Sequence, residues 1–429
     1  MNKPALLGGS PVRAIPYPPY NPIDEEARRR ADAVLESGLL SGFVGRGNAQ
    51  FYGGPVVLEL EAALCRRFGS AHAVTVNSAT SGLHAALLAA GIGPGDEVIV
   101  PPITMSATAS AVLMCGATPV FADIEPDYFC LDPEAVRKAV RPATRAIVAV
   151  NLFGQPAALG ELRDIADRNG LVLVEDSAQA PGAMYEGRPA GTVGHMGVLS
   201  FNRHKTVQCG EGGAVLTDDP RLAKRLQLLR NHGEVVVHDW GTGEDNDIVG
   251  YNYRLTDLQA AVVIPQIARL DDLNLPRIRL AEALSMALAP FDFLRTPRLR
   301  PGTSHVYYLY PITYSPDLLG LSQNTFVKAA SAEGVHLSAY VTPIGNLPVF
   351  GRAIPSAAAG PTRLFEGRAT GVKSAACPVA ERMASEQLVV TNICRPPLGM
   401  REIEEIAEAI GKVSANREAL ASWERGESG

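Results

Sequence analysis

The chain has 429 residues, which is long for one small domain and fits two domains that share a sizeable core. Charged residues make up 20% of the chain and the net charge is −6, so the sequence lacks the basic surplus of a nucleic-acid-binding protein. No apolar run reaches the roughly 18 residues that cross a bilayer, and the N-terminus lacks the apolar stretch of a secretory signal.

The first 55 residues are predicted to form an N-terminal arm with one amphipathic helix, Glu25–Ser37. Residues 39–54 then hold six glycines or serines and three aromatic residues. Such a segment packs poorly alone, and we expect it to wrap another surface.

Apolar strands then alternate with short helices. Strands are predicted at Ala73–Val76, Glu97–Val100, Thr118–Asp123, Arg145–Val150, Leu171–Glu175, Gly197–Phe201 and Ala214–Thr217. Helices are predicted at Ser81–Ala90, Ser106–Met114, Asp132–Val140, Leu159–Asn169 and Pro220–Arg230. This alternation predicts an α/β fold with a mostly parallel sheet covered on both faces.

The polar and acidic residues 235–249 interrupt this pattern and are predicted to form a surface loop. A long helix at Thr256–Leu273, a strand at Val306–Pro311 and helices at Thr325–Glu333 and Arg401–Val413 are predicted to follow. The charged last dozen residues are expected to fray. The predicted division is an arm and helix (1–55), a large domain (56–275) and a small C-terminal domain (276–429).

The cysteines are scattered, without a Cys-x-x-Cys pair or a Cys/His cluster. They are Cys65, Cys115, Cys130, Cys209, Cys377 and Cys394. This distribution predicts reduced thiols in a cytoplasmic protein and no metal site.

Two strand ends carry residues that could bind a ligand or take part in catalysis. Ligands of open α/β sheets bind beyond the carboxyl ends of strands. Residues 77–82 (NSATSG) follow the first strand and open a helix, where N–H groups, hydroxyls and the helix dipole bind phosphate. A plain helix cap is the alternative. Asp176 ends another apolar strand, where its carboxylate either holds a protonated ring nitrogen or caps the next turn.

A third strand end, Ser200–Gly213, places Lys205 between a strand and a glycine cluster. Lys205 is one of only seven lysines among 39 basic residues. A neighbour such as Arg203 would lower its pKa and make it a better nucleophile, although a surface turn is the usual place for a lysine. A phosphate-type helix start, then an aspartate, then a lysine resembles the order in fold-type I pyridoxal phosphate enzymes.

Four segments share a pattern with one known family: residues 77–112, 118–136, 174–219 and 250–262. From about residue 10 to residue 415, the chain resembles the DegT/DnrJ/EryC1/StrS family of sugar aminotransferases. The resemblance implies the aspartate aminotransferase-like fold, with a large domain built on a mostly parallel mixed sheet and a smaller C-terminal α/β domain. It also implies pyridoxal 5′-phosphate as cofactor, with pyridoxamine phosphate as its intermediate form.

The resemblance also implies roles for the residues around the cofactor ring. Lys205 would join the cofactor as a Schiff base and move the proton between substrate and cofactor. Asp176 would pair with the pyridine nitrogen, and Gln179 would bind the ring hydroxyl. A branch of the family that replaces this lysine with histidine performs deoxygenation, so Lys205 favours transamination.

A second group of positions would hold the rest of the cofactor. Ala79, Thr80 and Ser200 would bind its phosphate. Asn252 would reach the phosphate of the neighbouring subunit's cofactor, which requires a homodimer with shared active sites. Met105 stands where many relatives stack an aromatic residue on the ring, and a polarisable methionine covers the ring face differently.

Several further residues have open interpretations. His232 either lines the site or is structural, and Arg254 meets either substrate or the dimer interface. Tyr307, Tyr308 and Tyr340 fall where relatives bring substrate contacts, and core packing is the favoured interpretation for Tyr307 and Tyr308.

The resemblance thus implies an aminotransferase that moves an amino group from glutamate or glutamine to a keto group of a nucleotide-linked sugar or a keto-cyclitol. Its setting would be aminosugar, aminocyclitol or antibiotic biosynthesis. Two alternatives stay open. One is a pyridoxal phosphate-dependent elimination or aromatisation enzyme of the same family, and the other is a non-catalytic family member that acts as a partner protein.

Overall fold

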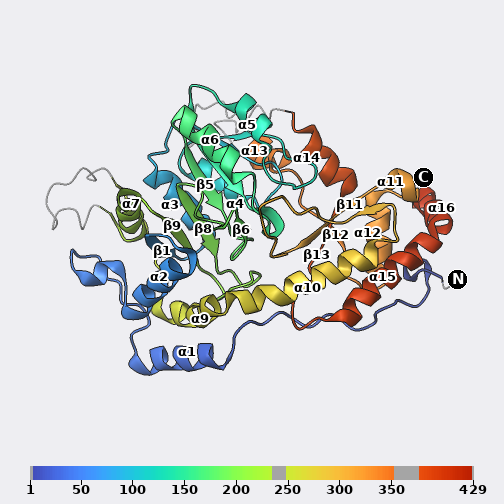
Figure 1. Ribbon diagram of the computed structural model, residues 1–429, viewed down its shortest axis with the longest axis horizontal. Helices are drawn as coiled ribbons and strands as arrows, with labels where there is room; N and C mark the ends of the chain where they lie inside the picture. The colour runs from blue at the N-terminus through green and yellow to red at the C-terminus, as the bar shows by residue number, and fades with distance from the viewer. Residues whose placement is uncertain (1–2, 234–247, 352–375, 428–429) are drawn as a thin grey trace.

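The computed structural model describes residues 3–233, 248–351 and 376–427, arranged around two larger sheets (Figure 1). The larger sheet has seven strands in the order β1-β9-β8-β5-β4-β2-β3. These strands are β1 (His72–Val76), β2 (Glu97–Val100), β3 (Thr118–Phe121), β4 (Thr144–Val150), β5 (Val172–Asp176), β8 (Met196–Ser200) and β9 (Gly213–Thr217). Only β9 runs antiparallel to its neighbours, so the predicted mostly parallel sheet is confirmed.

Helices cover both faces of this sheet because successive strand residues point to opposite sides. On β8, Val198 packs into the core that contains helix α3 (Ala79–Ala89), whereas Leu199 packs into the core of α2 (Pro55–Phe68) and α9 (Asp257–Ala268). The other helices of this region are α4 (Ala107–Met114), α5 (Pro133–Ala139), α6 (Leu159–Asn169) and α7 (Pro220–Arg230).

The smaller sheet is antiparallel throughout and has the order β10-β11-β13-β12. Its strands are β10 (Leu294–Arg295), β11 (Tyr310–Tyr314), β12 (Ser338–Ala339) and β13 (Leu388–Thr391). They share a core with α10 (Leu270–Leu288), α12 (Gln323–Ala332) and α15 (Met400–Ala415). Helix α10 runs through the predicted domain boundary at residue 275, so it links the two regions covalently.

One helix prediction is wrong, and one helix was missed. The single helix expected at Thr256–Leu273 is two helices, α9 and α10, which meet at the non-helical Arg269. Helix α10 continues past the predicted end at Leu273 and contains Pro276, whose missing N–H leaves the carbonyl of the exposed Asp272 without a helical partner. Helix α2 was not predicted at all, although Pro55 at its first position and Gly69 after its end are typical boundary signals.

Two further predictions fail near the C-terminus. The strand expected at Val306–Pro311 is β11, which begins only at Tyr310, because Val306 N–H and Leu309 N–H bond to carbonyls of residues 153–154 instead. Residues 417–427 do not fray, since α16 (Arg417–Glu427) buries Leu420 completely.

The N-terminal arm spans the length of the molecule (Figure 1). Near its start, Ala5 N–H donates to Glu333 Oε1 at 2.8 Å. It then runs past α10 to α1 (Glu25–Ser37), and Tyr20 Oη donates to the carbonyl of Thr206 at 2.7 Å. The segment expected to wrap a surface lies on its own chain, where Asn231 Nδ2 donates to two of its carbonyls.

Three further predictions concern a surface loop, membrane-spanning helices and the state of the cysteines. Most of the predicted loop at 235–249 lies outside the described residues. No helix in the described ranges is long and apolar enough to cross a bilayer. All six cysteines are free thiols.

Candidate active site

The loop that carries Lys205 is a closed hairpin between β8 and β9. Ser200 pairs with Gly213 across the two strands, and Lys205 N–H donates to the carbonyl of Asn202 at 2.8 Å. This turn aims the side chain at the smaller domain, where Lys205 Nζ lies 4.4 Å from the centre of the Tyr308 ring. The lysine is therefore held between the two regions of the chain.

The amine of Lys205 is primed to act as a nucleophile. Burial lowers the pKa of Lys205 to about 8, and the negative charge of Asp176 opposes that fall. The sequence predicted a lowered pKa from the neighbouring Arg203; the direction is right, but the cause is burial. An amine with this pKa is half neutral near pH 8 and available for attack on a carbonyl carbon.

Asp176 ends β5 as a buried carboxylate with two donors. Thr108 Oγ1 donates to Oδ2 at 3.0 Å, and Ala178 N–H donates to Oδ1 at 3.2 Å. Burial raises the pKa of Asp176, while the charge of Lys205 and these two donors lower it. Thr108 was missed by sequence reasoning, and the only signal was a small hydroxyl residue early in a helix that follows a strand end.

Gln179 has a fixed amide orientation. Its Oε1 accepts a hydrogen bond from Phe153 N–H at 2.8 Å, so its Nε2 is the group that faces the site. This nitrogen lies 3.5 Å from Tyr340 Oη, and the Tyr340 ring packs edge-on against Phe153 at 4.8 Å. Gln179 therefore presents an N–H donor to an acceptor oxygen of a ligand that lies beside Tyr340.

The start of α3 forms the second part of the site. Ser78 caps the helix by accepting from Ser81 N–H, and the first N–H groups of any α-helix have no partner within the helix. A Cβ on Gly213 would lie 2.8 Å from the nitrogen of Ala79, so only glycine lets β9 begin against this helix start. Ser200 pairs with the same Gly213, so it lies at the same edge of the sheet as the start of α3, which carries Ala79 and Thr80.

Asn252 and Met105 lie at the open edge of the site. The carbonyl of Asn252 accepts from Asn77 Nδ2 at 3.3 Å, which ties it to the residue before the α3 cap. Its side-chain oxygen accepts from Arg254 Nε at 2.8 Å, and its side chain is exposed. Met105 is 63% exposed in the single chain. Among the described residues, no hydrogen bond or ring contact joins either side chain to Lys205, and their predicted roles toward the cofactor stay predictions.

The tyrosines separate into two environments. Tyr307 stacks on His305 at 3.9 Å inside the smaller domain, as core packing predicts. Tyr308 departs from that expectation, because its ring lies under Lys205. His232 is exposed and has a left-handed backbone, with φ of 64°.

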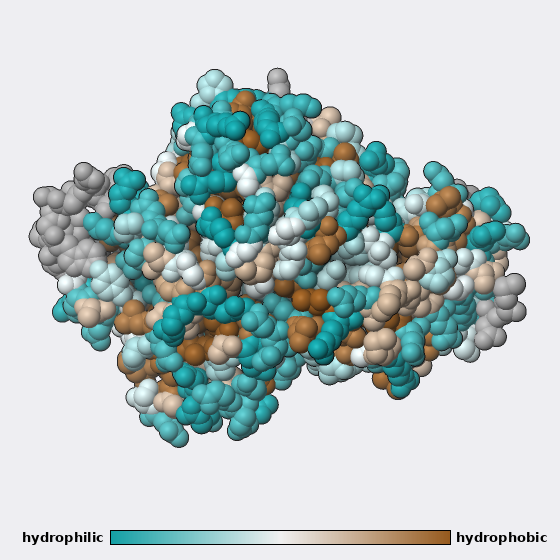
Figure 2. Space-filling view, viewed as in Figure 1, coloured by the Kyte–Doolittle hydropathy of each residue, from teal (hydrophilic) through white to brown (hydrophobic). Residues whose placement is uncertain are grey.

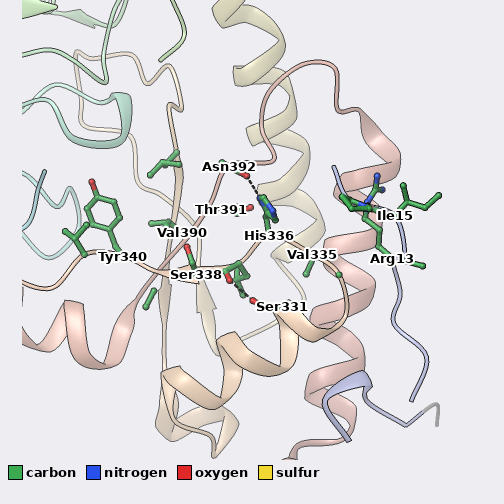
Figure 3. Close-up of a pocket in the computed structure, with 17 residues that line it drawn as sticks. Arg13, Ile15, Ser331, Val335, His336, Ser338, Tyr340, Val390, Thr391 and Asn392 are labelled. Atoms are coloured by element: carbon green, nitrogen blue, oxygen red, sulfur yellow. Dashed lines mark hydrogen bonds between the residues drawn. The ribbon is translucent and has the colours of Figure 1, made fainter. Parts of the chain in front are cut away.

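Tyr340 also borders a pocket of 690 Å³ between the smaller sheet and the N-terminal arm. Figure 3 shows Tyr340 on one side of this pocket and Arg13 on the other, with His336 between them. His336 Nδ1 lies 2.9 Å from Asn392 Oδ1. No group of His, Cys, Asp or Glu side chains in the described ranges could hold a metal ion.

Comparisons with known proteins agree with this geometry. The model of the DegT/DnrJ/EryC1/StrS aminotransferase family matches residues 44–410. An L-glutamine:2-deoxy-scyllo-inosose aminotransferase from Streptomyces kanamyceticus is 36% identical over 435 residues, covering 97% of this chain and 98% of that protein.

Two solved structures share the fold. DesI in the presence of its TDP-sugar product has a TM-score of 0.82 at 30% identity and covers 98% of both chains. S. venezuelae DesV in complex with a ketimine intermediate has a TM-score of 0.76 at 34% identity, covering 91% of this chain and 94% of that chain. The chain belongs to the DegT/DnrJ/EryC1/StrS aminotransferase family and is a pyridoxal phosphate-dependent transaminase of fold type I.

Proposed function

We propose that this transaminase moves the amino group of glutamine or glutamate to the keto group of a cyclitol, with a nucleotide-linked keto-sugar as the second candidate acceptor. The observation that carries the cyclitol is the 36% identity to an inosose aminotransferase over 97% of the chain. The likeness to DesI, seen with a TDP-sugar, keeps the second acceptor in view.

The described residues fit pyridoxal phosphate at each end. The α3 start with Ala79, Thr80 and Ser200 offers N–H groups and hydroxyls to a phosphate, and Gly213 lets β9 lie against this helix start. Asp176 is a buried carboxylate for a protonated ring nitrogen, and Nε2 of Gln179 is a donor for a ring oxygen. A cationic ring nitrogen would also stabilise the carboxylate form of Asp176.

When bound, pyridoxal phosphate supplies an aldehyde that condenses with amines and a ring that accepts an electron pair. Lys205 Nζ would hold the cofactor at that carbonyl carbon and, when its amine is free, would take the proton from the donor carbon. In the second half-reaction Lys205 returns a proton to the carbon of the former ketone. Its pKa of about 8 suits both steps, because the amine both loses and gains protons near neutral pH.

We further propose a homodimer in the cytoplasm, with Asn252 completing the partner's site. The exposed side chain of Asn252, fixed through its backbone to the α3 region, supports this role. Leu35, Leu39 and Leu40 near the end of α1 are each about half exposed. Figure 2 shows apolar residues gathered above α1 on an otherwise mostly hydrophilic face, a distribution typical of an interface. The free thiols support a reducing compartment.

The test is a complete transamination with the purified holoenzyme. L-glutamine or L-glutamate is supplied with a keto-cyclitol, and in parallel with a nucleotide-linked keto-sugar. We expect one 2-oxo acid released for each aminated product, and no turnover by Lys205→Ala with cofactor still bound. Lys138→Ala, an exposed lysine on α5, is the matched control and should keep wild-type turnover.

Two results would contradict the proposal. Loss of water or formation of an aromatic product without 2-oxo acid would establish the elimination reaction instead. Equal properties of Lys205→Ala and the wild type, with no cofactor absorbance in either, would establish a non-catalytic protein.

A further inference from the structure

A buried histidine of α3 contacts the segment that carries Asn252. His84 is 1% exposed, and its Nδ1 lies 2.8 Å from Tyr253 Oη. Its ring also meets the Tyr251 ring edge-on, with 5.2 Å between the two ring centres. None of the roles described so far uses these contacts, which join the helix at the proposed phosphate site to both neighbours of Asn252.

The backbone around Asn252 is extended. Asn252 forms an isolated antiparallel bridge with Asn231, and the N–H groups of Tyr251 and Tyr253 donate to carbonyls at the end of α7. Successive side chains of an extended segment point to opposite sides. The two tyrosine rings stack on each other, 4.9 Å apart, and both contact His84. The exposed side chain of Asn252 is therefore turned away from α3.

The exposed amide of Asn252 presents its donor end. Arg254 Nε donates to Asn252 Oδ1 at 2.8 Å, which settles the orientation of the amide. The Nδ2 atom therefore carries two N–H donors on the outer side of the amide. Phosphate oxygens are acceptors for such donors, so the orientation suits the proposed contact with a cofactor phosphate.

Tyr253 is held to the α3 region at two points. Asn77, which precedes the α3 cap, donates through its backbone N–H to the carbonyl of Tyr253 at 2.8 Å. His84, inside α3, meets the hydroxyl at the far end of the same residue. A residue held at its carbonyl and at the tip of its side chain has little freedom to turn. The adjoining Asn252 side chain therefore has a fixed direction relative to α3.

The bond between His84 and Tyr253 joins two neutral groups. Burial lowers the pKa of His84 to about 4, and the carbonyl of Met114 opposes that fall. Burial raises the pKa of Tyr253 to about 12. Neither group titrates between about pH 6 and about pH 10, so the bond is unchanged over the range in which Lys205 titrates.

We propose that His84 is a positioning residue that, through Tyr253, sets the direction in which Asn252 is offered to the cofactor phosphate of the partner subunit. The inference rests on the proposed homodimer and on the proposed role of Asn252. In that dimer, the helix at the phosphate site of one subunit also aligns the side chain that this subunit lends to the other site. One neutral hydrogen bond predicts an effect of about 5- to 10-fold on cofactor affinity.

The first experiment titrates the cofactor-free full chain with pyridoxal 5′-phosphate and follows protein fluorescence. Tyr253→Phe keeps the stacked ring, removes only the hydroxyl and should weaken binding about 5- to 10-fold. Tyr310→Phe is the matched control, because Tyr310 Oη lies 2.7 Å from Ser285 Oγ in the smaller domain's core, and it should keep wild-type affinity. His84→Leu should match Tyr253→Phe, and His84→Gln, whose amide can still meet a hydroxyl, should recover part of the affinity.

A double-mutant cycle separates positioning from a general loss of stability. Asn252→Ala should weaken cofactor binding by itself. Tyr253→Phe should then add no further loss, because the side chain that it would misdirect is already gone. A purely structural role of the hydroxyl would instead give losses that add.

Mixed dimers test whether the bond acts across the interface. Two differently tagged chains are co-expressed, and one of them carries Lys205→Ala, so only one site per dimer joins the cofactor covalently and changes its absorbance. With Tyr253→Phe on the Lys205→Ala chain, the site that keeps Lys205 should bind about 5- to 10-fold more weakly. With Tyr253→Phe on the chain that keeps Lys205, that site should bind as in the wild type.

Three outcomes would overturn the inference: unchanged affinity in folded Tyr253→Phe, additive losses in the cycle, or a loss confined to the site of the chain that carries Tyr253→Phe. If Asn252→Ala binds cofactor like the wild type, the proposed role of Asn252 fails and the inference fails with it. If every affinity behaves as expected and no ketone is aminated, the proposed transamination fails and the role of His84 stands.

Discussion

Replacing Asp176 by asparagine separates two opposing influences on the amine of Lys205. Burial lowers its pKa to about 8, and the carboxylate of Asp176 raises it. At pH 7 an amine with a pKa of about 8 is neutral in about one molecule in ten, whereas an ordinary lysine is neutral in about one in 2,500. The Lys205 amine is therefore about 200-fold more often in the neutral, nucleophilic form than an ordinary lysine.

The sign of the Asp176→Asn effect follows from the charge that is removed. The carboxylate favours the ammonium form, so without it the pKa of Lys205 falls further. An interaction of about 1.4 kcal/mol would move the titration midpoint down by about one pH unit. The neutral fraction at pH 7 would then rise about fivefold.

The assay labels the cofactor-free protein with trinitrobenzenesulfonate and measures modification of each lysine by mass spectrometry of peptides. The exposed Lys138 reports the intrinsic reactivity of the reagent. Wild-type Lys205 should titrate with a midpoint near 8, and Asp176→Asn below it. A wild-type midpoint near 10.4, or an upward shift in Asp176→Asn, would refute the reasoning.

Three further results are expected. Thr108→Val removes a donor to buried Asp176 and should lower the free energy of unfolding by about 2 kcal/mol in urea titration; an unchanged value would contradict the bond's role. Gly213→Ala places a Cβ against the α3 start and should weaken cofactor binding at least about tenfold in fluorescence titration, whereas Gly93→Ala, in open space, should not. Burial lowers the pKa of His84 to about 4, so the unfolded chain takes up that proton first. The free energy of unfolding should therefore fall by about 3 kcal/mol between pH 6.5 and pH 4, and His84→Gln should remove that fall.

Local signals predicted many elements of the larger domain accurately. Helix α1 and helix α6 begin and end where the sequence predicts, because a glycine in the left-handed conformation stops each of them. The strand ends that present Asp176 and Ser200 were predicted within a residue, since apolar β runs buried on both faces contrast with the polar residues after them.

The predictions failed where contacts between residues far apart in the sequence determine the local structure. Tyr307 has a left-handed backbone, and its neighbours bond to residues 153–154, so a run that looks like a strand is irregular. Leu420 is buried in the smaller domain's core, which orders a tail whose charged composition is typical of a frayed end.

The candidate site also contains residues that local sequence predicts and residues that only contacts between distant segments bring in. Lys205, Asp176 and Gln179 could be predicted because one stretch of sequence contains all three. Their partners come from elsewhere in the chain: Thr108 from α4, Phe153 N–H from a turn, and Tyr308 from the smaller domain. No local pattern identifies a backbone N–H or the hydroxyl of another helix as part of a site, so Thr108 and Phe153 were visible only in three dimensions. Tyr308 was named as a candidate, but core packing was the favoured interpretation for it.

The contacts of the N-terminal arm limit when this arm can dock during synthesis of the chain. Ala5 bonds to a residue 328 positions later, and the carbonyl of Ser10 accepts from a lysine 402 positions later. This segment is therefore translated long before its partners and finds its place only after they have been made. Tyr20 in this arm bonds to Thr206 beside Lys205, so the loop of the reactive lysine takes part of its support from a segment 186 positions earlier in the chain.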